Sequence, residues 1–145
     1  MSSISLATLK SPAGALPGQL ASVTQVSSSS TSSLANTASL NASFTKVLAK
    51  STFLIDVEMG VVPNTEVDAS VTIQFDGTTV GNAVPWHYTS GLNRANLCLP
   101  FFVASSSLAA GSHTLTVVSQ VVSSSSNTNQ IFGFTARISE FGSLT

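Results

Sequence analysis

Charged side chains are scarce in this chain. Asp, Glu, Lys and Arg make up 8% of its residues, whereas an average soluble domain has about 25%. The formal net charge is −1 and the five basic residues are scattered along the sequence. Nucleic-acid binding requires clustered Lys and Arg that meet several phosphates, and attachment to a membrane surface requires a basic amphipathic segment. The sequence therefore predicts neither a nucleic-acid partner nor a membrane partner.

Cysteine and long apolar runs are nearly missing as well. The single cysteine, Cys98, allows no disulfide within the chain. It lies in the apolar run Leu97–Leu99 with no base beside it, so we interpret it as a small buried hydrophobic side chain. The longest apolar stretch, 97–104, contains a proline and is far shorter than a membrane-spanning helix of about 20 residues. The N-terminus does not resemble a secretory signal, which predicts synthesis in a cytoplasm.

Hydroxyl side chains replace the missing charge. The chain has 27 Ser and 16 Thr, and 43% of its residues are hydrophobic. A surface with few charges has little electrostatic repulsion, so free monomers tend to associate. The composition therefore favours a protein whose surface is covered in an assembly, with a soluble monomer as the alternative. A chain of 145 residues is long enough to build one core without metals or disulfides.

Residues 1–38 differ in composition from the rest of the chain. They are rich in Ser, Thr and Ala, contain Pro12 and Pro17, and include the hydroxyl run Ser27–Ser33. Alone, such a segment buries too little apolar area to stay folded. We predict an extended N-terminal attachment arm over residues 1–38, which orders by docking on a partner, and a folded domain over residues 39–145. A disordered tail is the alternative.

From about Leu40 onward, apolar and polar residues alternate with the period of two that is typical of half-buried strands. Strands are predicted over 52–59, 67–75, 96–103, 113–121 and 130–141. Asp76–Gly77 is typical of a tight type I′ turn, after which a return strand begins. Pro100 indicates a sheet edge or a bulge. No helical period is sustained, so the sequence predicts an all-β fold: an antiparallel β-sandwich or jelly roll, with an extended N-terminal arm.

Motifs for catalysis, metals and nucleotides are absent from the sequence. His87 and His113 have no metal-binding spacing, and neither a nucleotide-binding nor a serine-hydrolase motif occurs. Asp56 and Glu58 could bind Ca²⁺ or act as acid and base, but they fit the solvated outer face of a strand better. We predict no enzyme and no catalytic, metal or cofactor residues. A hydrolase would need Asp56 or Glu58 beside a histidine in a cleft.

Trp86, His87 and Tyr88 form the one cluster that suggests binding. They include the only Trp and the only Tyr, and they fall in a long connection expected over residues 81–94. Aromatic side chains in a loop can stack on a ligand or anchor an interface. Alternatively, Trp86 covers the end of the core.

Several stretches carry a family resemblance. They are Ala42–Lys46 with Lys50–Val57, Val71–Gly77, and Leu108–Val117 with the closing Ala136–Gly142. Together, residues 42–142 resemble a domain of phage fibre, spike and decoration proteins, similar to tumour-necrosis-factor-like or complement-type jelly rolls. The resemblance implies a homotrimer around a threefold axis and no shared catalytic residues. The chain lacks the long shaft of a fibre, which favours a compact knob held by its arm.

These features predict a non-enzymatic virion structural protein. It would be a trimeric capsid decoration or short spike of a phage, anchored to other virion proteins through residues 1–38. It would be made in the host cytoplasm, work in the virion and need no cofactor. The alternative is a module for host adsorption that binds a receptor or a surface glycan through Trp86, His87 and Tyr88.

Overall fold

The computed structural model describes residues 16–34, 37–62, 67–88, 95–106, 108–123 and 129–144. In these ranges the chain is built of β-strands, and no helix long and apolar enough to cross a membrane occurs there. In chain order the strands are β1 (Leu20–Leu34), β2 (Thr37–Lys46), β3 (Ser51–Val62), β4 (Val67–Phe75), β5 (Thr78–Tyr88), β6 (Ala95–Ser106), β7 (Gly111–Ser123) and β8 (Asn129–Gly142). The predicted all-β class is confirmed.

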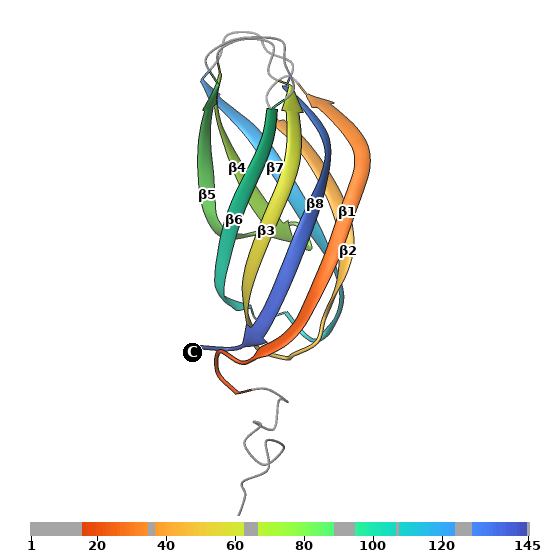
Figure 1. Ribbon diagram of the computed structural model, residues 1–145, viewed down its shortest axis with the longest axis vertical. Coiled ribbons are helices and arrows are strands. Elements are labelled where there is room, and N and C mark those ends of the chain that lie inside the picture. The colour runs from red at the N-terminus through yellow and green to blue at the C-terminus, as the bar shows by residue number, and fades with distance from the viewer. Residues whose placement is uncertain are drawn as a thin grey trace, which may run out of the picture.

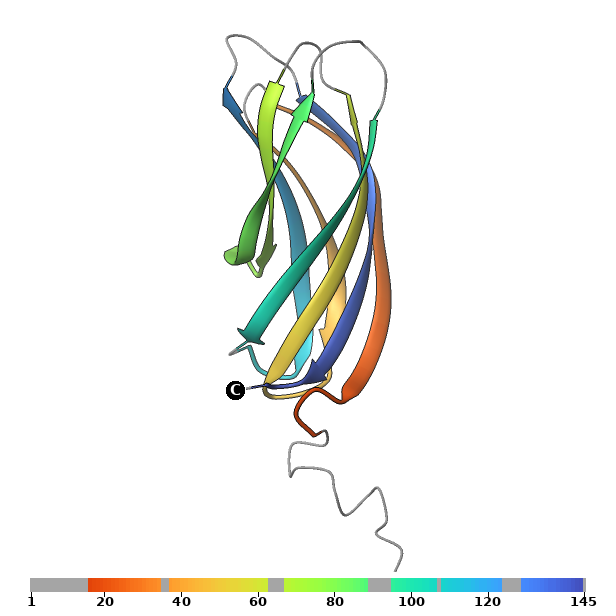
Figure 2. The same cartoon turned by 60° about the vertical axis from the view of Figure 1, so that its left-hand side comes forward.

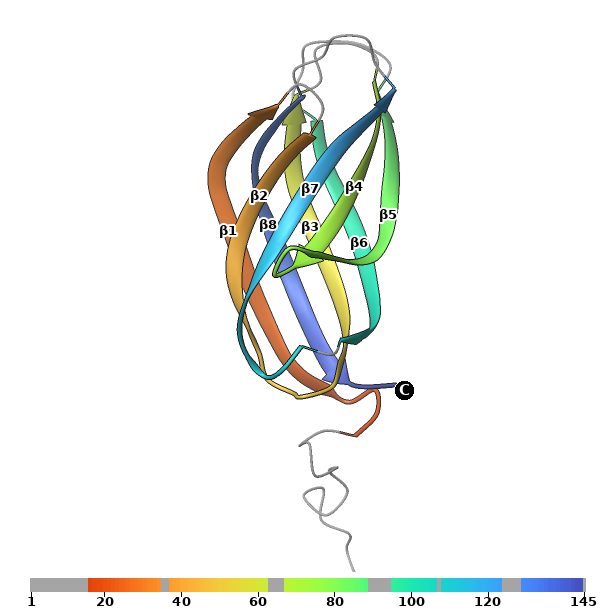
Figure 3. The same ribbon diagram turned by 180° about the vertical axis from the view of Figure 1, so that it is seen from behind.

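The strands form two antiparallel sheets that pack face to face. Sheet A has the order β1-β8-β3-β6 and faces the viewer in Figure 1, whereas sheet B has the order β2-β7-β4-β5 and faces the viewer in Figure 3. The pairs β1 with β8, β2 with β7, β3 with β6 and β4 with β5 are those of one long hairpin folded over on itself. Eight strands in two sheets with this pairing make a jelly roll, so the predicted sandwich is confirmed.

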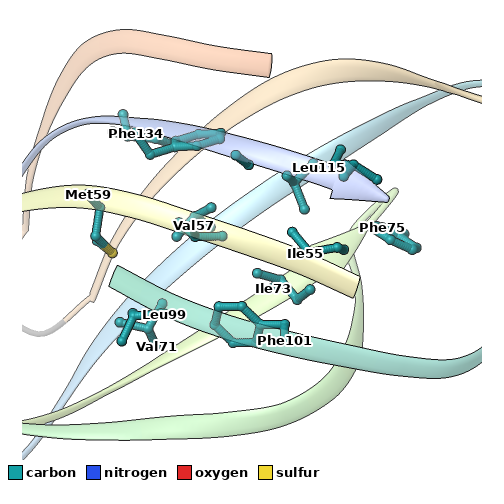
Figure 4. Packing of buried hydrophobic residues seen from close by; sticks show 14 of the residues in the cluster. Ile55, Val57, Met59, Val71, Ile73, Phe75, Leu99, Phe101, Leu115 and Phe134 are labelled. Atoms are coloured by element: carbon teal, nitrogen blue, oxygen red, sulfur yellow. The ribbon is translucent and has the colours of Figure 1, made fainter. Parts of the chain in front are cut away.

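The core lies between the sheets and uses the alternating positions that the sequence predicted. Phe53, Ile55 and Val57 of β3 are fully buried, and Figure 4 shows side chains of β3, β4, β6, β7 and β8 meeting in the same layer. At one end Phe53 packs against Phe44 and Phe75, with ring centroids 6.3 Å and 5.3 Å away. Each large apolar side chain buried in this way contributes about 1.5–3 kcal/mol, and the core fixes the strands that carry the outer faces.

The β4–β5 hairpin has the predicted turn. Asp76 and Gly77 have φ of 48° and 82°, the positive values that a type I′ turn needs at both central positions. The turn is fastened to β7, since Asp76 Oδ1 accepts a hydrogen bond from the Thr114 N–H at 2.8 Å. The Asp76 N–H in turn donates to the Thr114 carbonyl at 2.9 Å. The hydrogen bond from the Thr114 N–H, followed by the hydrogen bond with the His113 side chain, lowers the pKa of Asp76.

His113 is held between two acceptors. Its Nδ1 lies 2.6 Å from Asp76 Oδ2, and its Nε2 lies 2.8 Å from the Ala109 carbonyl oxygen. The hydrogen bond to Asp76, followed by the one to Ala109, raises the pKa of the His113 imidazole. Both ring nitrogens face acceptors, so the protonated imidazole can donate to both and join the β4–β5 turn to the start of β7.

A buried polar cluster joins β8 to the corner between β2 and β3. Glu140 is 1% exposed, and its Oε2 accepts from Val47 N at 2.8 Å while its Oε1 accepts from Leu48 N at 2.9 Å. Hydroxyl groups of Ser22 and Ser51 donate to the same carboxylate. The four donors lie on β1, on the corner at residues 47–48 and at the start of β3. Glu140 therefore holds these three segments against β8.

Lys46 is buried beside this cluster. Its side chain is 1% exposed, and its Nζ donates to the Leu48 carbonyl oxygen. Desolvation lowers the pKa of Lys46, and the negative charge of Glu140 opposes that shift. A buried ammonium is tolerated here because a carboxylate lies near it.

The folded domain begins well before residue 39, where the sequence placed its start. Residues 20–34 form β1, which pairs along β8 from Leu20↔Phe141 to Leu34↔Asn129. The hydroxyl run lacks apolar alternation, but the ladder is made by backbone N–H and C=O groups, which Ser and Thr supply as well as other residues. Residues 1–15 of the expected arm lie outside the described residues.

Candidate functional site

A shallow trough runs along the outer face of sheet A. It consists of two adjoining hollows of ≈ 700 and ≈ 550 Å³, which share Glu58, Cys98 and Thr135. We call it the sheet A trough and define it by its outward polar and small side chains: Gln25, Ser27, Asp56, Glu58, Asn96, Cys98, Pro100, Thr135 and Arg137. All of them stand on paired strands, so the backbone ladder fixes their spacing.

The strand register arranges these side chains in rows across the sheet. In strand order the rows are Gln25–Arg137–Asp56–Pro100 and Ser27–Thr135–Glu58–Cys98. Arg137 Nη2 donates to Asp56 Oδ2 at 2.9 Å, and the two side chains are 64% and 52% exposed. An exposed pair of this kind adds about 0–1 kcal/mol to stability. Its main effect is to hold a guanidinium and a carboxylate side by side in the trough.

The carboxylate of Glu58 lies unpaired in the trough. Its side chain is exposed, and within the described part of the chain no hydrogen bond or ion pair engages it. Asp56 and Arg137 neutralise each other, so Glu58 leaves the trough with one net negative charge. The trough thus offers acceptors from two carboxylates and donors from one guanidinium.

Next to the trough, toward the end of β8, the same face is apolar. The adjoining row carries Val23, Leu54 and Phe102, which are 55%, 46% and 51% exposed. Leu20 pairs with Phe141 beside this row, and Leu144 N donates to Thr52 there. We call Leu20, Val23, Leu54, Phe102 and Leu144 the apolar band. They are five of the seven large hydrophobic side chains exposed among the described residues.

Cys98 lies in the trough, whereas the sequence predicted that it is buried in the core. It is exposed on the outer face of β6. Leu99, Phe101 and Val103 point inward, and strand alternation sends Cys98 to the opposite side. The alternation was hidden in the sequence because Cys98 and Phe102, which face outward, are themselves apolar.

Trp86 and His87 lie on β5 and not in a loop. The long connection expected over 81–94 is a strand as far as Tyr88, and residues 89–94 lie outside the described residues. Neighbouring side chains of a strand face opposite ways, so Trp86 packs against the core while His87 faces outward. His87 Nδ1 lies 2.5 Å from Asp68 Oδ1. The side chain of Tyr88 also lies outside the description, and the position of Trp86 agrees with the core-covering alternative.

Gly81 and Pro85 concealed this strand in the sequence. The β4–β5 ladder slips between Val71↔Val84 and Ile73↔Val80, which leaves Gly81 in a bulge. Gly81 has φ +71°, and a Cβ added there would lie 3.1 Å from the Phe102 carbonyl oxygen. The bulge therefore brings β5 close to β6, the two edge strands that come forward in Figure 2. Pro100 lies on β6, which confirms its predicted place at a sheet edge.

The arrangement that a hydrolase would need is not formed among the described residues. Asp56 and Glu58 stand on the outer face of sheet A, whereas His87 and His113 belong to sheet B. Each histidine contacts an aspartate of its own sheet. The described part of the chain also holds no group of three or more His, Cys, Asp or Glu placed to bind a metal ion.

No protein-family model matches the chain, and no curated protein matches it significantly. Among solved structures, that of infectious bursal disease virus strain Gx has a TM-score of 0.49 at 15% identity, covering 95% of this chain and 37% of that one. Carbohydrate-Binding Module CBM36, solved with calcium and xylotriose, has 0.43 at 12% identity over 81% and 91%. The sugar-binding C-terminal domain of EclA has 0.42 at 18% identity over 94% and 99%. Likeness at this level carries no conclusion about function.

Proposed function

We propose that the protein binds carbohydrate chains along the sheet A trough. The observation that carries the proposal is the trough itself: two adjoining open hollows lined by planar hydrogen-bonding side chains on a rigid sheet. A long, open depression suits an extended chain better than a compact ligand, for which enclosed apolar pockets are usual. The protein acts by binding carbohydrate.

The side chains of the trough match the chemistry of sugar hydroxyl groups. A hydroxyl both donates and accepts hydrogen bonds. Asp56 and Glu58 can accept from two neighbouring hydroxyls, and Arg137 can donate two parallel bonds. The ion pair with Asp56 already orients Arg137, so little side-chain entropy is lost when a ligand binds.

The charge of the trough favours neutral carbohydrate. With Asp56 and Arg137 paired, the carboxylate of Glu58 leaves a net negative charge where the ligand lies. An acidic sugar would place a like charge against Glu58, which lowers affinity. Neutral oligosaccharides are therefore the ligands to test first, with a polyuronate as the acidic comparison.

Glu58→Ala is expected to weaken binding of neutral oligosaccharides by about tenfold or more, because hydrogen bonds to a charged group are worth about 1.5–3 kcal/mol. Glu58→Gln should retain most of the affinity for neutral ligands and gain affinity for the polyuronate, since the amide keeps an acceptor without the charge. Calorimetric titration of each variant with both ligand types measures these changes.

His87→Ala is the matched control for that experiment. His87 is exposed like Glu58 but lies on sheet B, within the cluster that the sequence singled out. We expect unchanged affinity for neutral oligosaccharides in this variant. Loss of binding in His87→Ala together with full binding in Glu58→Ala would move the site to β5.

A structural role in a virion is the second candidate. It is supported by the low charge of the chain and by the apolar band on an otherwise polar face. Because residues 20–34 belong to the sandwich, attachment to capsid or tail proteins would fall to residues 1–15. Deleting residues 1–15 should abolish co-sedimentation with phage particles and leave the sandwich folded. Undiminished co-sedimentation of the shortened chain would contradict this role.

A further inference from the structure

The outer face of sheet A is complementary to itself. We infer that two copies of this chain pack face to face through it, related by a twofold axis that runs parallel to the strands between β3 and β8. The inference goes beyond carbohydrate binding, and it rests on a separate observation: the order of the side chains within each row. Sheets packed face to face lie about 10 Å apart, a gap that side chains from both copies fill.

Under this symmetry the central charges match. Since sheet A has the order β1-β8-β3-β6, the twofold axis sets β3 against β8 of the second copy. Asp56 then faces Arg137 of the second copy, and Arg137 faces Asp56 of the second copy. The two side chains are 52% and 64% exposed, so they stand clear of the sheet. The central row of the interface therefore holds four charges of alternating sign, in which every charge has a neighbour of the opposite sign.

The flanking positions match as well. The same axis sets β1 against β6 of the second copy. Val23 then faces Phe102, and both are about half exposed in the single chain. One row further, Glu58 faces the Thr135 hydroxyl, which can donate to it. Val23, Leu54 and Phe102 of the apolar band are thereby removed from water on both copies, which favours association.

A second copy fits this face better than the segment 1–15 of the same chain. That segment carries one charged residue, Lys10. Lys10 could pair with Asp56, but the segment has no carboxylate side chain for Arg137. A second copy supplies an opposite charge to both Asp56 and Arg137. Packing of two copies also covers the sheet A trough, so the pair and the carbohydrate complex exclude each other.

Sedimentation equilibrium of the full chain tests the inference, with Asp56→Arg and Arg137→Asp as paired variants. The full chain is expected at twice 14.8 kDa. Each variant sets like charges against each other, so its dissociation constant should rise by about tenfold or more. Mixed in equal amounts, the two variants should recover the association, because an all-positive row then faces an all-negative one.

Several results would overturn the inference. They are a full chain that stays at 14.8 kDa at every concentration, or one found at three times that mass, as the threefold assembly implied by the family resemblance would give. Variants that associate like the full chain, or a mixture that stays monomeric, would also refute it. Both substitutions are at exposed positions, and thermal unfolding of each variant verifies that it is folded.

Discussion

Replacing Glu140 with alanine is expected to cost about 3–5 kcal/mol of unfolding free energy, the range for breaking a buried charged network by removing one partner. The backbone N–H groups of Val47 and Leu48 would lose their acceptor, as would the Ser51 hydroxyl. Lys46 would keep its buried ammonium without the carboxylate that opposes the desolvation shift of its pKa. The midpoint of urea unfolding measures the loss.

Two further variants separate the network from a general effect of losing a carboxylate. Glu140→Gln keeps one oxygen with its two hydrogen bonds, so its loss should be smaller than that of Glu140→Ala. Glu58→Ala removes an exposed carboxylate and should change stability by less than about 0.5 kcal/mol. A Glu140→Ala protein within about 1 kcal/mol of the parent would show that the cluster does not hold the corner in place.

Gly133→Ala is expected to cost about 2–4 kcal/mol, combining backbone strain with overpacking. Gly133 has φ +68°, and a Cβ there would lie 2.6 Å from the Ser28 carbonyl oxygen on β1. Backbone cannot yield as a side chain does, so β1 must shift away from β8 at the point where their register already slips. Unfolding curves measure the cost, and faster hydrogen exchange of the amides of residues 31–34 locates it.

Gly77→Ala is the matched control, because it isolates the backbone conformation from the clash. Gly77 has φ +82°, but no atom lies within 4 Å of a Cβ built there. Its substitution should cost about 1 kcal/mol, at the low end of the range for strained backbone. If Gly133→Ala were no more costly than Gly77→Ala, the close approach of β1 to β8 would be wrong. Gly133 and Ser28 also line the trough, so Gly133→Ala should reduce ligand affinity too.

The central strands could be predicted from the sequence because burial on one face imposes a period of two. β3 places Phe53, Ile55 and Val57 inside and Asp56 and Glu58 outside, as the alternation indicates. The Asp76–Gly77 turn was equally local, since its backbone angles depend on two adjacent residues.

Strand β1 could not be predicted in this way. Its hydroxyl run shows no apolar face, and what makes it a strand is pairing with β8, which follows 95 (Leu34↔Asn129) to 121 (Leu20↔Phe141) residues later in the chain. Composition identified residues 1–38 as unusual but could not show which part of them finds a partner. Strand β5 could not be predicted either, because a bulge at Gly81 interrupts the alternation of apolar and polar residues that predicts a strand.

The trough was foreseen only in part. The alternation predicted that Asp56 and Glu58 face outward. The other trough residues lie on β1, β6 and β8, and the register of these strands with each other and with β3 brings them next to Asp56 and Glu58. Arg137 is 81 positions from Asp56 in the sequence and 2.9 Å from it in the structure. The sequence favoured Trp86, His87 and Tyr88 because they include the only Trp and the only Tyr of the chain. A binding face made of common polar residues can be recognised only once the pairing of the strands is known.

Carbohydrate binding in the sheet A trough is tested most directly by an amide NMR titration of the full chain with neutral oligosaccharides of three or more units. We expect saturable shifts on the outer face of sheet A, centred on Gln25, Asp56, Glu58, Cys98 and Arg137, with little change on sheet B. Shifts confined to β5 around Trp86 and His87, or no shifts with any neutral oligosaccharide, would contradict it.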